Sequence, residues 1–227
     1  MIQLIEGAER AVSGKTVLLT GAGGSIGSAL ASAVFRLDPR HLILLDHAER
    51  NLFQVDSELR AAHDRGMWTA ALGDICDEKL LYEIFQTHRP EIVLHAAAFK
   101  HVPIMENNPF AAIRNNALGT NMLAKLSQAE GVAKFVMIST DKAVNPISIM
   151  GASKRVAELS LLHLNNSKSQ MSAVRLGNVL GSHGSVVPTF LRQISRGGPV
   201  TVTHGDASRH FLTIDVSVEL ILLALRP

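Results

Sequence analysis

The chain has 227 residues, of which 47% are apolar, and its 22 basic and 20 acidic side chains leave a net charge of +2. These values exclude intrinsic disorder, and the scattered charges with one tryptophan and one tyrosine disfavour a nucleic-acid partner. Cys76 is the single cysteine, so an internal disulfide is excluded, no metal site is expected, and a reducing compartment is favoured. We expect no secretory signal and no membrane segment in this chain, and therefore a cytoplasmic protein or the soluble domain of a membrane-associated parent.

Short apolar runs alternate with helical patterns over the first 176 residues. Strands are expected at residues 16–20, 41–46, 68–72, 92–95, 134–139 and 171–176. Helices are expected over residues 25–37, 52–63, 78–87, 109–130 and 149–164. This alternation predicts an α/β protein with a Rossmann-like, doubly wound parallel sheet.

A glycine-rich turn, GAGGSIG, lies at residues 21–27 between the first expected strand and helix. Glycines permit positive φ and the close approach of a pyrophosphate, and the following helix N-terminus offers N–H groups to phosphates. Asp46 ends the second strand 19 residues beyond Gly27, where a carboxylate accepts hydrogen bonds from a ribose diol and repels a 2′-phosphate. The pattern predicts an NAD site and disfavours NADP, a preference that the nearby Arg50 weakens. The alternatives are an ordinary tight turn for the glycines and a helix cap for Asp46.

Further cofactor contacts follow the third and fourth strands. Asp74 is expected to accept a hydrogen bond from the adenine amine, unless it is a simple turn residue, and small alanines let the cofactor ribose approach. The predicted contacts are Gly21, Gly24, Ser25, Ile26, Gly27, Asp46, Asp74, Ile75, Ala96, Ala97 and Ala98.

The pattern changes after residue 176, where glycine- and serine-rich loops lead to a helix near residues 187–196 and a last apolar helix from Val216. We therefore predict a NAD-binding Rossmann-like domain at residues 1–176. Residues 177–227 begin a substrate-binding portion that is intertwined with it. Because the sequence stops directly on ELILLALRP, we expect a small, truncated C-terminal portion and a longer parent chain.

A group of reactive side chains follows the fifth strand, at the edge where open α/β sheets bind ligands. Thr140, Asp141 and Lys142 stand together there, and Met150 and Lys154 lie one helical turn apart further on. Lys154 can reach a nicotinamide ribose, Thr140 can bind a substrate hydroxyl, and the other two offer an acid and a base. Taken singly, Asp141 is a helix cap and Lys142 a solvated charge, but the group favours a catalytic site.

Several longer motifs make a family resemblance specific. The chain resembles an extended short-chain dehydrogenase/reductase, and within it a nucleotide-sugar 4,6-dehydratase of polysaccharide biosynthesis, similar to UDP-N-acetylglucosamine 4,6-dehydratases. The likeness covers about residues 13–225. It rests on GAGGSIG at 21–27, HAAAFKHVP at 95–103, NNALGT at 115–120, STDKAVNP at 139–146, MGASKR at 150–155, RLGNVLG at 175–181, GGPVTVT at 197–203 and RHFLTI at 209–214.

The resemblance implies a cofactor that is recycled within each turnover. NAD(P) takes hydride from C4 of a UDP-linked N-acetylglucosamine, water leaves from C6, and the hydride returns to C6. By family position Lys142 abstracts the C5 proton, Asp141 assists loss of the C6 hydroxyl, and Thr140 binds the 4-oxygen. Lys154 orients the nicotinamide ribose.

Met150 departs from the tyrosine that most of this superfamily uses as a base, and a thioether cannot take up a proton. A membrane-associated branch of the dehydratases resembles this chain in having methionine there, so Asp141 becomes the candidate acceptor of the 4-hydroxyl proton. A nucleotide-sugar epimerase and an inactive NAD-binding scaffold are the alternative functions.

Four residues are expected at the substrate end by resemblance: Lys100, His101, Asn178 and Arg209. Asn178 would contact the diphosphate, and Arg209 would pair with phosphate or uridine. Lys100 and His101 would line the sugar pocket, and a satisfied structural histidine is the alternative for His101. His210 stands where relatives often have tyrosine. A homo-oligomer is expected through the helices at 109–130 and 149–164, whose apolar residues would also suit packing against the sheet.

Overall fold

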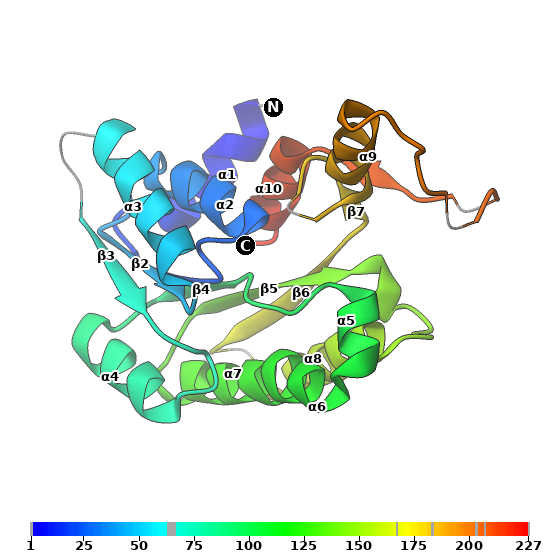
Figure 1. The fold of residues 1–227 in the computed structure, drawn as a ribbon. Coiled ribbons are helices and arrows are strands. Elements are labelled where there is room, and N and C mark those ends of the chain that lie inside the picture. The colour runs from blue at the N-terminus through cyan, green and yellow to red at the C-terminus, as the bar shows by residue number, and fades with distance from the viewer. Residues whose placement is uncertain are drawn as a thin grey trace.

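Figure 1 shows the fold in a computed structural model, which describes residues 2–62, 67–166, 168–182, 184–202, 204–206 and 208–226. A six-stranded parallel sheet forms the middle layer, and helices cover both of its faces. The expected Rossmann-like, doubly wound α/β fold is confirmed.

Runs rich in valine, leucine and isoleucine form most of the sheet, because such runs can bury both faces of a parallel strand. The strand order is β3-β2-β1-β4-β5-β6, so the chain changes direction across the sheet between β1 and β4. Ligands bind at the carboxyl ends of the strands beside such a switch point. The strands are β1 (Thr16–Thr20), β2 (His41–Asp46), β3 (Trp68–Leu72), β4 (Ile92–His95), β5 (Lys134–Thr140) and β6 (Gln170–Leu176).

The helices form two layers with a separate apolar core beneath each. Val17 and Leu19 of β1 pack in the core on the α2 side, whereas Leu18 packs with Phe85 and Phe135 on the opposite side. One layer contains α1 (Ile2–Val12), α2 (Ser25–Phe35), α3 (Glu49–Ala62) and α10 (Ile214–Leu223), and the other contains α4 (Glu78–His88), α7 (Thr120–Ala129) and α8 (Ile149–Leu164).

Some helices differ from the sequence-based expectations. Helix α1 and the short α5 (Val102–Asn107) after β4 were not predicted. The single helix predicted over residues 109–130 is divided into α6 (Pro109–Ala112), a π-helical segment η1 (Ile113–Gly119) and α7. The predicted end of the second helix, His63, lies outside the described residues.

Segment η1 turns polar side chains into the interior. Asn116 Nδ2 donates to the Phe99 carbonyl oxygen at 2.9 Å and to Ser153 Oγ at 3.0 Å, and Asn116 Oδ1 accepts from the Phe99 N–H at 2.8 Å. These bonds join the loop after β4 to η1 and α8. The prediction of an uninterrupted α-helix was wrong because alanine and leucine spacing carries no information on such polar contacts.

The segment after β6 forms a small second sheet and adds a helix to the core on the α2 side. Strand β7 (Asn178–Val179) pairs in parallel with β8 (Phe211–Leu212), and α9 (Val186–Ser195) lies between them in the chain. Helix α10 packs against α2 and α1, and its Val218 and Ile221 belong to the core on that side. The division at residues 176 and 177 remains a prediction, and Thr203 of the GGPVTVT motif lies outside the described residues.

Candidate active site

Two adjoining cavities lie at the carboxyl edge of the sheet. The larger, of about 920 Å³, reaches from the glycine-rich turn to the ends of β5 and β6, and the smaller, of about 160 Å³, extends to the end of β2. Both are bordered by the turn after β1 and the alanines after β4. The shared lining residues are Gly21, Gly24, Asn51, Ala96, Ala98 and Phe99.

The glycine-rich turn fits a bound pyrophosphate because it has almost no side chains. Gly21 has a φ of +68°, and a Cβ there would lie 2.5 Å from the Ala97 backbone nitrogen. Gly24 caps α2 without a side-chain hydrogen bond, and the first turn of α2 lines the larger cavity. The backbone N–H groups and positive end of the helix dipole therefore face this space.

Asp46, at the end of β2, is buried with 7% of its surface exposed, and it lines the smaller cavity. Its Oδ2 accepts from the Gly23 N–H and its Oδ1 from the Ala48 N–H, each at 2.8 Å. The carboxylate thus fixes the glycine-rich turn and the turn after β2. Because each oxygen can accept more than one bond, contact with a ribose diol also remains open to it.

Of the predicted contacts around the adenosine, some line a cavity and one does not. Ile75 and the alanines after β4 line the smaller cavity, whereas Asp74 lines neither cavity. Asp74 Oδ1 accepts from the Cys76 N–H at 2.9 Å, and its Oδ2 lies 3.7 Å from the Arg114 guanidinium. Asp74 therefore acts as a turn residue here, and its contact with adenine stays a prediction.

The Thr-Asp-Lys triplet forms a connected group after β5. Thr140 and Lys142 line the larger cavity, and Asp141 lies behind them. Asp141 Oδ1 accepts from Thr140 Oγ1 at 3.0 Å and from Lys142 Nζ at 2.9 Å, and Lys142 Nζ also donates to Asn178 Oδ1 at 3.0 Å. Partial burial raises the pKa of Asp141, but the bonds from Lys142 and Thr140 outweigh it and leave the pKa below its usual value.

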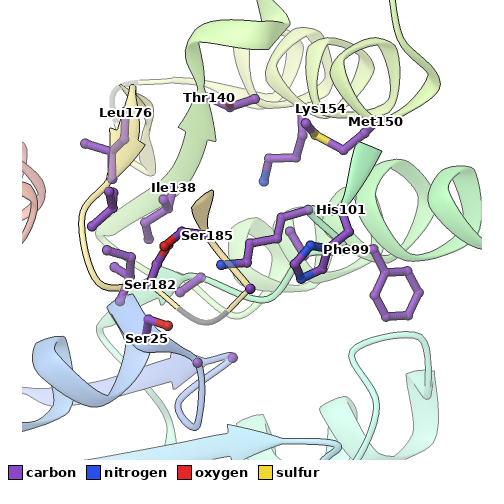
Figure 2. A pocket seen from close by; sticks show the side chains of 18 of the residues that line it. Ser25, Phe99, His101, Ile138, Thr140, Met150, Lys154, Leu176, Ser182 and Ser185 are labelled. Atoms are coloured by element: carbon purple, nitrogen blue, oxygen red, sulfur yellow. The ribbon is translucent and has the colours of Figure 1, made fainter. Parts of the chain in front are cut away.

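Helix α8 supplies Met150 and Lys154 from consecutive turns, as their spacing predicts. Ser148 caps this helix by accepting from the Gly151 N–H at 3.1 Å. Figure 2 shows Thr140, Met150 and Lys154 on one side of the cavity, with the amino group of Lys154 directed into it. Burial lowers the pKa of Lys154 to about 8, against the raising effect of Glu158. Met150 packs among apolar neighbours, including Met105.

Three of the four predicted substrate residues line the larger cavity: Lys100, His101 and Asn178. Arg209 does not, and its Nη1 donates to the Ser208 carbonyl oxygen at 2.6 Å. Burial lowers the pKa of Lys100. Sequence reasoning missed the contribution of α9, whose N-cap Ser185 lies across the cavity from Lys154 in Figure 2. It also missed Asn51, Phe99, Ile104, Ser182, Val186 and Phe211.

A buried histidine, His95, ends β4 directly before the alanines that line the two cavities. His95 Nε2 lies 2.8 Å from Thr120 Oγ1, and its Nδ1 lies 2.7 Å from Thr20 Oγ1. Because the Thr120 hydroxyl donates to the Asn116 carbonyl oxygen, it accepts from Nε2–H, and Nδ1 accepts from Thr20. Burial, with a smaller contribution from the Lys154 charge, lowers the pKa of His95 to about 3.

We predict an acid-sensitive fold from His95. Its folded pKa of about 3 lies below the usual histidine pKa of 6.5, so the unfolded chain binds the proton first and stability falls as pH decreases from 6.5 towards 3. Between pH 7 and pH 5 the loss from His95 should be about 2 kcal/mol. Urea unfolding of the wild type and His95→Gln at both pH values measures it; an equal pH dependence in the two proteins would contradict the prediction.

The described residues contain neither a membrane-spanning helix nor a cluster of metal-binding side chains. In the parts of the chain that the structure describes, no helix combines the length and apolar character needed to cross a bilayer. Over the same residues, no group of three or more histidine, cysteine, aspartate or glutamate side chains is arranged to hold a metal ion.

The doubly wound sheet, the glycine-rich turn and Lys154 on α8 are features of the extended short-chain dehydrogenases/reductases, the class to which the chain belongs. The chain belongs to the family described as "Polysaccharide biosynthesis protein", whose model matches residues 17–226. Proteins similar to it in sequence or structure include polysaccharide biosynthesis proteins and UDP-glucose 4-epimerases.

Known proteins agree with this assignment. The chain is 49% identical over 218 residues to the capsular polysaccharide biosynthesis protein CapD of Staphylococcus aureus, covering 95% of this chain and 36% of CapD. It is similar to the X-ray structure of Pen from Bacillus thuringiensis, with 32% identity, a TM-score of 0.86 and coverage of 92% and 66% of the two chains. A UDP-glucose 4-epimerase of Thermotoga maritima, solved with UDP-glucose, shows 26% identity, a TM-score of 0.78 and coverage of 92% and 72%. The chain thus spans about a third of the length of CapD.

Proposed function

We propose that this chain is the catalytic portion of a NAD-dependent nucleotide-sugar 4,6-dehydratase, a hydro-lyase that converts UDP-N-acetylglucosamine to a 4-keto-6-deoxy sugar. One observation carries this proposal: Thr140, Lys142 and Lys154 line the same cavity as the glycine-rich turn. A hydride carrier, a base and a hydroxyl donor would then share one water-poor space, which is what a combined oxidation and elimination needs.

The residues present fit a dinucleotide. The side-chain-free turn and the first turn of α2 suit its pyrophosphate, and the buried Asp46 carboxylate disfavours a 2′-phosphate, which supports NAD over NADP. Lys154 would hold the nicotinamide ribose, and Ile75 and the alanines after β4 would border the adenosine. When bound, NAD supplies the acceptor for the C4 hydride and the source of the hydride that reaches C6.

The chain's own residues would move two protons. Thr140 binds the 4-oxygen and relays the 4-hydroxyl proton. Its Oγ1 takes up that proton while its own hydroxyl proton passes to the ionised Asp141, to which it is already hydrogen-bonded at 3.0 Å. Lys142, acting as the amine, removes the C5 proton once the 4-ketone has acidified it. Asp141 returns its proton through Thr140 to the C6 hydroxyl, which leaves as water, and Lys142 reprotonates C5.

The charge of the cavity supports a nucleoside diphosphate as the anionic half of the substrate. Lys100, His101, Lys142 and Lys154 line the larger cavity, and no carboxylate does so among the described residues. A pyrophosphate entering this space would therefore meet basic side chains that can donate hydrogen bonds to its oxygens. Asn178, and Arg209 after a movement of its side chain, are the further proposed contacts.

Met150 should have no part in proton transfer under this proposal. Its side chain is buried beside Met105 and Ala112, and Leu has nearly the same volume. We expect Met150→Leu to lower stability by less than about 1.5 kcal/mol and to leave turnover within a few-fold of the wild type. Steady-state rates and thermal unfolding measure both. A loss of turnover with a native fold would show that the thioether itself is needed.

Proton NMR of the product formed in D₂O from UDP-N-acetylglucosamine tests the function, with the protein in its full natural length. We expect a product lighter by one water, deuterium at C5 and no net NADH. The likeness to UDP-glucose 4-epimerase favours epimerisation as the second candidate, which would give an isomer of unchanged mass. Retention of unchanged substrate would reject both candidates and favour the NAD-binding scaffold.

We further propose that the chain forms a homo-oligomer through the surface formed by α6, η1 and α8. Large apolar side chains are exposed there, which a partner subunit would cover. Analytical ultracentrifugation tests this arrangement. The residues are Phe110, Ile113, Leu118, Val156, Leu159 and Leu162.

A further inference from the structure

Glu158 is a buried carboxylate on α8 with 4% of its surface exposed, and it lines neither cavity. Its Oε1 accepts from Ser139 Oγ at 2.6 Å and from Arg175 Nε at 2.9 Å. Its Oε2 accepts from Arg175 Nη2 at 2.7 Å and from Arg155 Nη1 at 2.9 Å. Four hydrogen bonds therefore converge on one interior carboxylate, two of them from the fork of a single arginine.

These contacts join three elements immediately beneath the proposed reacting groups. Ser139 is the residue before Thr140 on β5, Arg175 lies on β6, and Glu158 itself lies one helical turn after Lys154 on α8. Thr140 and Lys154 project into the cavity from β5 and α8. A carboxylate that ties these two elements to β6 therefore sets the distance between them.

The charge of Glu158 also acts on Lys154, which is buried with 3% of its surface exposed. The pKa of Lys154 is lowered by burial and raised by Glu158. His95 on β4 also interacts with Lys154 and is neutral above its pKa of about 3, and Lys142 lines the same cavity. Burial raises the pKa of Glu158, but its hydrogen bonds, first from Arg175, outweigh it and leave the pKa at about 2. Glu158 is therefore a buried carboxylate one helical turn from this lysine, and its charge raises the pKa of Lys154.

We propose that Glu158 is a positioning residue of the active site, which fixes the Thr140 and Lys154 turns against β6 and supplies the counter-charge that keeps Lys154 protonated. The proposal deepens the proposed function and rests on it for the roles of Thr140 and Lys154. Glu158 acts through its neighbours and touches neither sugar nor cofactor. A purely structural carboxylate would stabilise the fold without affecting the titration of the lysine.

The titration of Lys154 in Glu158→Gln separates these roles. NMR of the purified chain with ¹³C-labelled lysine follows each side chain against pH, and the signal missing from Lys154→Arg identifies Lys154. We expect the Lys154 midpoint to fall by about one pH unit in Glu158→Gln. The control Glu83→Gln, which removes an exposed carboxylate on α4, should leave it unchanged. An unchanged midpoint in Glu158→Gln would overturn the proposal.

A second variant, Glu158→Asp, tests the proposal if Glu158→Gln does not fold. Glu158→Asp keeps the charge but withdraws it by one methylene, so we expect a smaller fall of the midpoint; no fall in this variant would also overturn the proposal. In the full-length protein, the alkaline limb of the kcat profile should move to lower pH with the KM for the sugar nucleotide unchanged. If the wild type forms no product, the proposed function fails, whereas the lysine titration still decides the counter-charge.

Discussion

Replacing Lys142 with methionine is expected to lower turnover of UDP-N-acetylglucosamine by about 10³-fold while leaving NAD affinity unchanged. The lysine amino group lies 2.9 Å from Asp141 Oδ1 and 3.0 Å from Asn178 Oδ1, so two acceptors hold it at the cavity wall. Methionine preserves much of the side-chain length but cannot take up the C5 proton. The glycine-rich turn follows β1, away from this contact, so the cofactor site should be intact. Product mass spectrometry and calorimetric titration with NAD measure the two effects.

Lys79→Met is the matched control for this substitution. The Lys79 side chain is 88% exposed on α4, where its amino group lies 3.9 Å from Glu83, so its removal should alter neither turnover nor NAD affinity. Deuterium exchange at C5 of recovered material adds a direct readout of the missing base. Wild-type turnover or undiminished C5 exchange in Lys142→Met would remove Lys142 from the mechanism.

The central strands β1, β2 and β4 could be predicted from the sequence because burial on both faces leaves a strong, local signal. The expected bounds of β1, β2, β3 and β4 agree with the structure, and β5 and β6 each gained one residue. Helix α8 was also predicted with its observed bounds. The π-helical turn of η1 could not be predicted, because it depends on bonds from Asn116 to Phe99 and Ser153, which are distant in sequence. Non-local hydrogen bonds of this kind leave no periodic pattern in the chain.

The sequence could predict which strand ends carry the site. The turn after β1 and the group after β5 each follow a strand of the same parallel sheet. Because parallel strands end at one edge, both segments are expected there. Side-chain direction was beyond the sequence. Asp141 lies behind Thr140, Asp74 turns to the Cys76 N–H, and Asp46 holds two backbone amides. The Glu158 cluster was also missed, because its partners are drawn from three separate elements.

The second large effect is expected at the glycine-rich turn, where Gly27→Ala should weaken NAD binding by about 100-fold. An added Cβ would overlap the Gly21 carbonyl oxygen and come within 2.9 Å of the Ala22 Cα, so the backbone must move. Movement here withdraws the α2 N–H groups from the cavity, and losing two hydrogen bonds to charged phosphate costs about 3 kcal/mol or more. Overpacking should also lower the free energy of unfolding by about 1–3 kcal/mol.

Gly205→Ala distinguishes this steric effect from a general effect of replacing glycine. A Cβ at Gly205 has no neighbour within 4 Å among the described atoms, so the substitution should leave NAD affinity and stability unchanged. Calorimetric titration with NAD, combined with urea unfolding of both variants, provides the comparison. Since the titration measures binding and not turnover, it tests the cofactor site independently of the dehydratase proposal. Native NAD affinity in a folded Gly27→Ala protein would mean that the pyrophosphate does not lie along this turn, and the assignment of the larger cavity to the cofactor would then fail.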